Sequence, residues 1–391
     1  MQCVSHLPTW DLTNQRVFVR ADLNVPLIND MILDAHRLYT VLPTLDLILQ
    51  KGGTIILATH IGRPTIPTEK LSTKVLLPWF KTHGYQIEYA ATPQEATQKS
   101  INTIATIILL ENLRFFPGEK KKELSFAQQL AACADYYVND AFASLHRDDA
   151  SIAIMPTLYT ADKRSIGLLI QHELSALAPL KKPQQPFVLL IGGGKVVDKL
   201  PLLEGFLPTV STILLCPAFI FSIMKAVGKP TGQSLIAPNS SDIIHRFLQS
   251  AKEQAVQIIT PVDFQIARGS YDGPLSIVAS DAIPHDGYGI SVGPETIKLF
   301  APHIKNAKTI LYNCAMGFFA RPETLESTKK LLKMIALSEG YSVVAGGESV
   351  AAAHYFNVQQ KIQYLTTGGG AVLTYLAGKK LPGLDILCPR H

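Results

Sequence analysis

The chain has 391 residues, of which 47% are hydrophobic and 17% charged, and its 36 lysines and arginines against 31 aspartates and glutamates give a net charge of +5. This length accommodates two or three domains with cores of their own, which excludes a disulfide-built mini-protein, and the composition excludes a disordered chain. No apolar run is long enough to span a bilayer, and the charge is too small and too dispersed for a nucleic-acid-binding protein.

Short apolar runs rich in β-branched residues recur along the chain, and each is followed by a break and then by a helical pattern. Continuous apolar strands that alternate with helices indicate parallel sheets covered on both faces. Segments 124–134 and 294–300 are among the predicted amphipathic helices. The predicted strands, in chain order, are 17–19, 54–58, 104–110, 136–138, 187–191, 212–215, 257–259, 309–312, 342–344 and 364–366.

Ten strands favour two α/β domains rather than one sheet. A predicted helix at 166–180 runs into the polar, proline-containing stretch 181–186, a pattern typical of a connector between domains. We therefore place a first lobe at residues 1–165, a connector at 166–186 and a second lobe at 187–378. A single barrel of eight α/β units is an alternative. The residues that follow the strands differ in kind between the two halves of the chain, which argues against a single barrel.

Basic and polar side chains follow four successive strands of the first half. Ligands of parallel α/β sheets bind beyond the carboxyl ends of the strands, so we expect these side chains to share one crevice. Any single arginine is more often a surface ion-pair partner, but guanidinium groups after several strands suit a small, multiply charged anion. The residues are Asp22, Asn24, Arg37, His60, Arg63, Arg114 and Arg147.

Glycine clusters follow strands of the second half, at residues 192–194, 346–347 and 368–370. Glycines let backbone N–H groups approach a phosphate closely, although a tight turn is the ordinary reason for any one cluster. The first cluster departs from both the Walker A loop and the dinucleotide fingerprint. With Lys195 and Lys199 four residues apart and Glu348 suited to Mg²⁺, the three clusters together indicate a site for a nucleotide triphosphate.

The two halves together suggest a kinase that moves a phosphoryl group between a nucleotide and a small anionic molecule. A carboxylate nucleophile is already ionised at neutral pH, with a pKa of roughly 3.5, so no histidine base is required.

The five cysteines are widely spaced and odd in number: Cys3, Cys133, Cys216, Cys314 and Cys388. We expect reduced thiols, with neither a disulfide framework nor a zinc site. The sequence begins without the basic and apolar segments of a secretory signal. A cytoplasmic protein without membrane or nucleic-acid partners is the expectation.

Ten short blocks stand in a distinctive order. The first, residues 20–26, has the pattern R-x-D-x-N-x-P, and the others are 60–64, 111–115, 138–147, 192–199, 261–264, 293–296, 313–319, 346–350 and 367–371. In these blocks the chain resembles the phosphoglycerate kinase family along nearly its whole length. The resemblance implies two Rossmann-like lobes of three α/β/α layers with parallel sheets, joined by a hinge helix, with residues 379–391 returning to the first lobe.

The resemblance further implies a monomeric, cytoplasmic, glycolytic enzyme. It would move a phosphoryl group reversibly between ATP and the carboxylate of 3-phosphoglycerate, giving ADP and 1,3-bisphosphoglycerate, with Mg²⁺ and with closure of the lobes on a hinge. The seven residues of the first crevice would bind 3-phosphoglycerate, and Arg37, Lys195, Gly369 and Gly370 would serve the transfer itself. The nucleotide would be bound by Gly193, Gly194, Lys195, Lys199, Asn313, Glu323, Gly346, Gly347, Glu348 and Ser349, with Glu348 as the Mg²⁺ ligand.

Departures from the family pattern gather where the nucleoside would bind. Leu214, Leu215 and Cys216 stand where the family has a glycine run, and Cys314 and Ala315 replace the two residues that usually follow Asn313. Ala320 stands where the family has the acid that holds the ribose, and Glu323 is a possible substitute for that acid. Glu348 replaces an aspartate. Asp148 and Asp149 add negative charge beside Arg147. We expect retained catalysis with altered base preference and nucleotide affinity. A non-catalytic binding or scaffold protein and a nucleotide-dependent kinase of another small acid are the alternatives.

Overall fold

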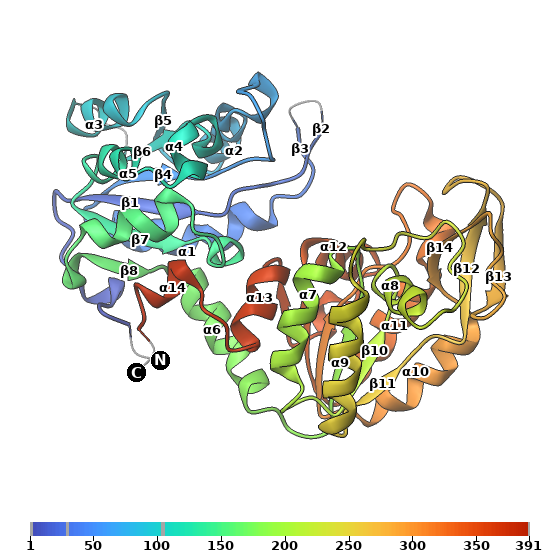
Figure 1. The fold of residues 1–391 in the computed structure, drawn as a ribbon. Helices are drawn as coiled ribbons and strands as arrows, with labels where there is room; N and C mark the ends of the chain where they lie inside the picture. Colours follow the sequence, from blue (N-terminus) through green and yellow to red (C-terminus); the bar gives the residue numbers. More distant parts are fainter. Residues whose placement is uncertain (1–2, 29–30, 103–105, 390–391) are drawn as a thin grey trace. The chain divides into compact units, whose positions relative to one another are not determined.

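The computed structural model describes residues 3–28, 31–102 and 106–389. It divides into two compact units (Figure 1), of which unit 1 comprises residues 1–175 and 380–391 and unit 2 comprises residues 176–379. Each unit contains a parallel sheet of six strands. The two separate sheets show that the alternative of one eight-unit barrel is wrong.

The sheet of unit 1 has the strand order β5-β6-β4-β1-β7-β8, and all its neighbouring strands are parallel. Its strands are β1 (Arg16–Ala21), β4 (Thr54–Ala58), β5 (Ile87–Ala90), β6 (Ile107–Leu110), β7 (Tyr136–Asp140) and β8 (Arg164–Ile166), and a small antiparallel pair is formed by β2 (Leu27–Ile28) and β3 (Met31–Ile32). The helices are α1 (His36–Gln50), α2 (Leu77–Thr82), α3 (Pro93–Asn102), α4 (Pro117–Lys121), α5 (Leu124–Ala131) and α14 (Pro382–Asp385), and α6 (Leu168–Lys181) continues into unit 2.

The parallel sheet of unit 2 has the order β11-β10-β9-β15-β16-β17. Its strands are β9 (Phe187–Ile191), β10 (Thr212–Leu215), β11 (Gln257–Ile259), β15 (Thr309–Asn313), β16 (Tyr341–Ala345) and β17 (Tyr364–Thr366). A second, antiparallel sheet contains β12 (Asp263–Arg268), β13 (Leu275–Ala279) and β14 (Gly287–Val292). The helices are α7 (Val196–Leu203), α8 (Phe219–Ala226), α9 (Ser241–Glu253), α10 (Pro294–Asn306), α11 (Glu326–Ala336), α12 (Gly347–Tyr355) and α13 (Gly369–Leu376).

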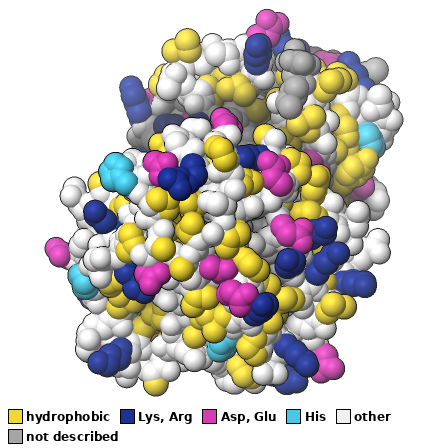
Figure 2. All heavy atoms as spheres, turned by 90° about the vertical axis from the view of Figure 1, so that its right-hand side faces the viewer, with side chains coloured by type: hydrophobic (Ala, Val, Ile, Leu, Met, Phe, Trp, Pro, Cys, Tyr) yellow, Lys and Arg dark blue, Asp and Glu magenta, His cyan; other side chains and the backbone are white. Residues whose placement is uncertain are grey.

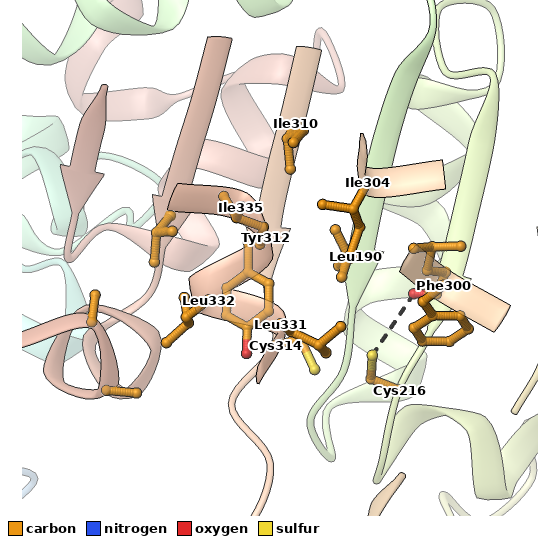
Figure 3. Close-up of a cluster of buried hydrophobic side chains, with 14 of the residues drawn as sticks. Leu190, Cys216, Phe300, Ile304, Ile310, Tyr312, Cys314, Leu331, Leu332 and Ile335 are labelled. Atoms are coloured by element: carbon orange, nitrogen blue, oxygen red, sulfur yellow. Dashed lines mark hydrogen bonds between the residues drawn. The ribbon is translucent and has the colours of Figure 1, made fainter. Parts of the chain in front are cut away.

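The central strands are continuously apolar because helices cover both faces of each sheet. Every residue of β6, β9, β10 and β15 is buried. In unit 2, Leu190 of β9 and Tyr312 of β15 belong to the same buried cluster as Phe300 and Ile304 of α10 and Leu331 of α11 (Figure 3). The helices thereby hold the carboxyl ends of the strands, where the candidate site residues lie, in fixed positions.

All ten predicted strands are present, except that the first residues of the predicted strand 104–110 lie outside the described residues. The sequence missed the edge strands β5 and β8 and the antiparallel sheet β12–β14. These strands are short or partly exposed, as in β13, where no residue is buried, so they lack a continuous apolar run. The prediction of parallel sheets alone was therefore incomplete for unit 2.

The C-terminal segment lies in unit 1, next to the beginning of the chain. Leu387 O accepts a hydrogen bond from Val4 N at 2.8 Å, and Cys3 and Cys388 form a disulfide. The prediction that all five cysteines are reduced is therefore wrong for this pair, because 385 residues of sequence separate two cysteines that the fold brings together. Cys133, Cys216 and Cys314 are free and buried, as predicted.

The composition argues against nucleic-acid and membrane partners, and the surface charges and the helices can be compared with that expectation. On the face shown in Figure 2, basic and acidic side chains are interspersed with one another. Among the described residues, the helices are all too short or too polar to cross a bilayer.

The connecting helix α6 is anchored in unit 1 by a buried carboxylate. Asp140, the last residue of β7, accepts hydrogen bonds from Ile170 N at 3.2 Å and from Thr44 Oγ1 at 2.5 Å. Thr44 Oγ1 in turn accepts from Leu168 N at 2.9 Å, so the two side chains satisfy backbone donors in the first turn of α6. Gly167 leaves the necessary space, since a Cβ there would lie 2.3 Å from Asp140 Oδ1.

Burial raises the pKa of Asp140 from 3.8 to about 7, so the protonated form is favoured in the folded protein. The measured quantity is the free energy of unfolding of wild type minus that of Asp140→Asn. We expect this difference to be greatest near pH 4 and to fall by roughly 1 kcal/mol per pH unit until about pH 7. Denaturant unfolding followed by tryptophan fluorescence measures this, because both tryptophans, Trp10 and Trp79, lie in unit 1. Parallel pH profiles for the two proteins would contradict it.

Candidate active site

A cluster of basic side chains lies at the carboxyl ends of the strands in unit 1. His60, which follows β4, lies between two guanidinium groups: its Nδ1 is 3.1 Å from Arg20 Nη2, and its Nε2 is 3.0 Å from Arg147 Nη1. A neutral imidazole accepts a hydrogen bond at only one of its two nitrogens. Only one of the two arginines can therefore donate to this ring, and the ring offers no acceptor to the other.

The loops around His60 are held in place by further polar contacts. Arg37 pairs with the carboxylate of Asp22. Asn24 Oδ1 accepts from Gly62 N at 2.8 Å, and Arg114 donates to Gly62 O. Gly62 has a φ of +64°, a left-handed conformation that glycine adopts without strain. The residues after β1, β4 and β6 are thus linked through one glycine peptide.

The cluster is electrostatically crowded. Burial, followed by the charges of Arg20 and Arg114, lowers the pKa of His60 well below 6.5, so the ring is neutral. Burial and the charge of Arg147 lower the pKa of Arg114 to about 10, which still leaves Arg114 charged at neutral pH. Burial lowers the pKa of Arg147 as well. An anion bound here relieves the repulsion among these groups, and the crowding therefore favours anion binding.

The basic cluster borders a cavity of about 360 Å³. Arg114 Nε is buried there without a hydrogen-bond partner among the residues that the structure describes. The lining residues are Arg63, Pro64, Arg114, Lys120, His146 and Arg147. The structure therefore brings the seven residues predicted from the strand ends into one region, with Arg63 exposed at the cavity and Asp22 and Asn24 in the loop after β1.

Sequence reasoning missed three residues that support this cluster. Arg20 is fully buried in β1 and donates from Nε to Ser151 Oγ at 3.0 Å. Ser151 donates from Oγ to the buried Glu119 at 2.6 Å. A basic residue directly after the apolar run 17–19 of β1 was the signal for Arg20, whereas Glu119 and Ser151 give no local signal because they meet Arg20 only through the fold.

The two acidic residues that follow Arg147, Asp148 and Asp149, pair with lysines of the segment 120–122. Lys120 Nζ lies 2.9 Å from Asp149, and Lys122 pairs with Asp148. Asp149 is buried, and its charge raises the pKa values of Arg114 and Arg147 against the effect of burial. It therefore offsets part of the positive charge of the cluster.

In unit 2, the ends of β9 and β15 are joined by a half-buried lysine. Lys199 of α7 donates from Nζ to Gly192 O at 2.6 Å and to Asn313 Oδ1 at 3.0 Å. Burial lowers the pKa of Lys199, and the charge of Lys195 acts in the same direction. Lys195 is exposed at the N-cap of α7, where its carbonyl accepts from Lys199 N. Two cationic groups thus stand at the start of one helix.

The three glycine clusters meet around Asn313. Its Nδ2 donates to Ala345 O at 2.7 Å, and it would lie 3.1 Å from a Cβ at Gly346 and 3.0 Å from a Cβ at Gly369. Gly346 has a φ of +104°, so a side chain there would also strain the backbone. Bare backbone at the N-termini of α12 and α13 is therefore exposed to a ligand beside Asn313, and such N-termini bind phosphate.

A larger cavity of about 670 Å³ adjoins this region. Its wall is largely apolar and includes aromatic rings from separate segments, among them Tyr271 and Phe318, whose centroids are 5.7 Å apart. The cavity is also lined by Gly193, Leu235, Ala320 and Glu348. An apolar cavity beside anion-binding backbone matches the two ends of a nucleotide.

Gly193 and Glu348 line the cavity, whereas Glu323 does not. Its carboxylate is exposed and accepts from Arg321 Nε at 2.9 Å, and Arg321 and Ala320, but not Glu323, are among the described residues that line the cavity. Ser349 is buried in the first turn of α12. Gly194, Gly347, Glu348 and Gly370 are exposed at the starts of α7, α12 and α13.

A family model and known proteins match nearly the whole chain. The phosphoglycerate kinase family model matches residues 7–379. The phosphoglycerate kinase of Dictyoglomus turgidum is 34% identical over 388 residues, which is 96% of each chain. The chain belongs to the phosphoglycerate kinase family. The resemblance seen in the sequence blocks is confirmed, and membership of this family supports a kinase that uses a nucleotide co-substrate.

Solved structures of the family confirm the fold. The phosphoglycerate kinase of Coxiella burnetii is 31% identical with a TM-score of 0.77 and 97% coverage of both chains. The phosphoglycerate kinase of Pyrococcus horikoshii is 26% identical with a TM-score of 0.80 and 98% coverage of both chains. The predicted fold class, two α/β lobes with parallel sheets, is therefore correct.

We expect the His60 ring of the unliganded protein to stay neutral where an ordinary histidine, with a pKa of 6.5, takes up a proton. Nitrogen-15 spectra of the imidazole should show one protonated and one bare nitrogen at pH 6.5, where an ordinary histidine is half protonated. Arg147→Met removes a neighbouring cation and should move the titration to higher pH. A wild-type ring that titrates as an ordinary histidine is the contrary result.

Proposed function

We propose that the chain catalyses reversible, Mg²⁺-dependent phosphoryl transfer between ATP and the carboxylate of 3-phosphoglycerate, giving ADP and 1,3-bisphosphoglycerate. The observation that carries this proposal is the presence of two unlike sites on two units: crowded guanidinium groups on unit 1 and glycine-edged helix starts beside an apolar cavity on unit 2. Family membership supports the same reaction. We further propose a glycolytic role for a cytoplasmic monomer.

Unit 1 would bind 3-phosphoglycerate, which carries a phosphate and a carboxylate. Arginines bind both groups through paired hydrogen bonds, and Arg63, Arg114 and Arg147 line the cavity of unit 1. His60 would stay neutral and act as a hydrogen-bonding group. Asp22 and Asn24 would fix the loop after β1, and Asp22 would orient Arg37.

Unit 2 would bind the nucleotide with its base in the apolar cavity and its phosphates at the glycine clusters. Lys199 would hold the phosphates while fixing the ends of β9 and β15. Ala320 offers no acceptor to the ribose, and the Glu323 carboxylate is engaged by Arg321, so we propose that ribose contributes little to affinity in this chain. Base preference would then depend on the aromatic wall formed by Tyr271 and Phe318.

Phosphoryl transfer requires positioning and charge stabilisation more than covalent chemistry. The substrate carboxylate is the nucleophile. Arg37 and Lys195 would balance the charge of the phosphoryl group in transit, and the N–H groups of Gly369 and Gly370 would donate to its oxygens. We propose that the transfer follows closure of the two units, which excludes water, and small-angle scattering should show compaction when both substrates are bound.

Glu348 fits the Mg²⁺ of a nucleotide. The described residues hold no group of three or more metal-binding side chains, and Glu348 offers one exposed carboxylate at the rim of the cavity. Mg²⁺ is commonly bound by one or two carboxylates together with substrate phosphates, so this donor set suits an ion that arrives with the nucleotide. When bound, Mg²⁺ would neutralise phosphate charge.

A coupled assay with ATP, Mg²⁺ and 3-phosphoglycerate tests the proposal. Turnover supports it. Binding of 3-phosphoglycerate without turnover with any purine nucleotide would support a scaffold protein instead, and turnover with a different small acid alone would make the chain another kind of kinase.

We expect Arg37→Ala to lower kcat by at least about 100-fold, as removal of one charge-stabilising donor does in other enzymes. Arg37→Lys keeps the charge and can still pair with Asp22, so its loss should be smaller. Steady-state kinetics measures both, with the melting temperature as the control for folding. An unchanged kcat in Arg37→Ala would remove Arg37 from the catalytic residues.

A further inference from the structure

Two of the free cysteines meet at the carboxyl end of the sheet in unit 2. Cys216 follows β10 and Cys314 follows β15, and both strands border β9. Both side chains are buried, with exposed fractions of 0% and 2%. Figure 3 shows the two side chains in the same part of the core.

The contact depends on a glycine between the two cysteines. Gly192 follows β9, and a Cβ at this position would lie 2.6 Å from Cys314 Sγ and 3.1 Å from Cys216 Cβ. The two cysteine side chains therefore lie next to each other over the bare backbone of Gly192. Any side chain at residue 192 would separate them.

The spacing of the strands prevents these thiols from forming a disulfide. Adjacent strands lie about 4.8 Å apart, so two strands on either side of a third are roughly 9.5 Å apart, whereas the Cα atoms of a disulfide are usually 4.4–6.8 Å apart. The backbone is also held to β9 on both sides, because Ile191 O accepts from Cys216 N at 2.8 Å and Asn313 O accepts from Gly192 N at 3.2 Å. A third atom between the sulfurs can bridge a distance that an S–S bond cannot.

The surroundings favour a neutral product. Burial raises the pKa of the Cys216 thiol, so this site disfavours thiolate charge. The fully buried Tyr312 hydroxyl, whose environment includes both cysteines, lacks a hydrogen-bond partner among the described residues. A ligand that takes both sulfurs, leaves no charge and offers an acceptor or lone pair to Tyr312 would suit the site.

We propose that Cys216 and Cys314 form a dithiol site for monosubstituted trivalent arsenicals. In the reaction, R–As=O and two thiols give R–As(S–Cys)₂ and water. Two As–S bonds form, the As–O bonds are lost, and the two thiol protons leave with the oxygen. No group is oxidised or reduced, and the product is neutral.

The dithiol site lies directly behind the larger cavity of unit 2. Pro217, Ala218, Ala315 and Met316, which follow the two cysteines, line that cavity, and Gly193 N donates to Pro217 O at 3.0 Å. An arsenic atom between the sulfurs would displace this wall. On the proposed function, in which the cavity binds the nucleoside, ADP and an arsenical would therefore exclude each other.

Phenylarsine oxide tests the site. After incubation without reductant, so that the Cys3–Cys388 disulfide persists, and removal of free reagent, intact mass spectrometry should show one phenylarsenic group per wild-type chain. Cys216→Ala and Cys314→Ala should each retain at least tenfold less, and Cys133→Ala, which removes a free buried cysteine of unit 1, should retain as much as wild type. Circular dichroism confirms that each variant is folded.

No retention by wild type, or undiminished retention by either folded variant, would overturn the proposal. Saturating ADP should slow wild-type labelling at least tenfold, and unchanged labelling by a protein that binds ADP would overturn the link to the cavity. Calorimetry of ADP with the unmodified protein tests nucleotide binding separately. Its failure would refute the proposed function while the retention experiment still decides the dithiol site.

Discussion

Positive charge crowded against positive charge is the constraint that shapes unit 1. Arg20, Arg114 and Arg147 surround the neutral ring of His60, and each repels the others at short range. The fold holds them together through acids placed around the cluster: Glu119 acts on Arg20 through Ser151, and Asp149 acts on Arg114 and Arg147. These acids offset only part of the charge, and a molecule with two anionic groups supplies the remainder. The loops that carry Arg114 and Arg147 must be held at the ends of their strands, because loops free to move would let the arginines move apart.

The candidate site of unit 2 contains fewer charged side chains than the basic cluster of unit 1. Its proposed phosphate-binding surface consists mostly of backbone, which glycines expose beside Asn313, and the half-buried Lys199 fixes the ends of two strands. The substitutions at Cys216, Cys314 and Ala320 lie in or next to the wall of the apolar cavity and leave Lys195 and Lys199 in place. The chain has therefore changed the part of the site that would recognise the nucleoside without changing the lysines that would meet the phosphates.

The sequence predicted what is local and periodic. Buried strands such as β1 and β9 are visible as apolar runs, and the polar residues that follow them locate the site, because the carboxyl ends of parallel strands share one edge of the sheet. Contacts between distant segments were not predictable in this way. The aromatic wall joins Tyr271 to Phe318, and the disulfide joins Cys3 to Cys388, without any pattern within either segment. Strand β13 likewise has no buried residue, so its sequence lacks an apolar run, and it pairs with β12 in the antiparallel direction.

The two units are completed at different times during synthesis of the chain, because unit 1 includes residues from both ends of the sequence. Unit 2 is one continuous segment, residues 176–379, and can complete its core once that segment has left the ribosome. Unit 1 still lacks residues 380–389 at that moment, including α14, whose Gly383 N donates to Leu145 O at 3.1 Å. The N-terminal unit, although translated first, is consequently the last to be finished, and a released chain truncated after residue 379 would carry all of unit 2 and an incomplete unit 1.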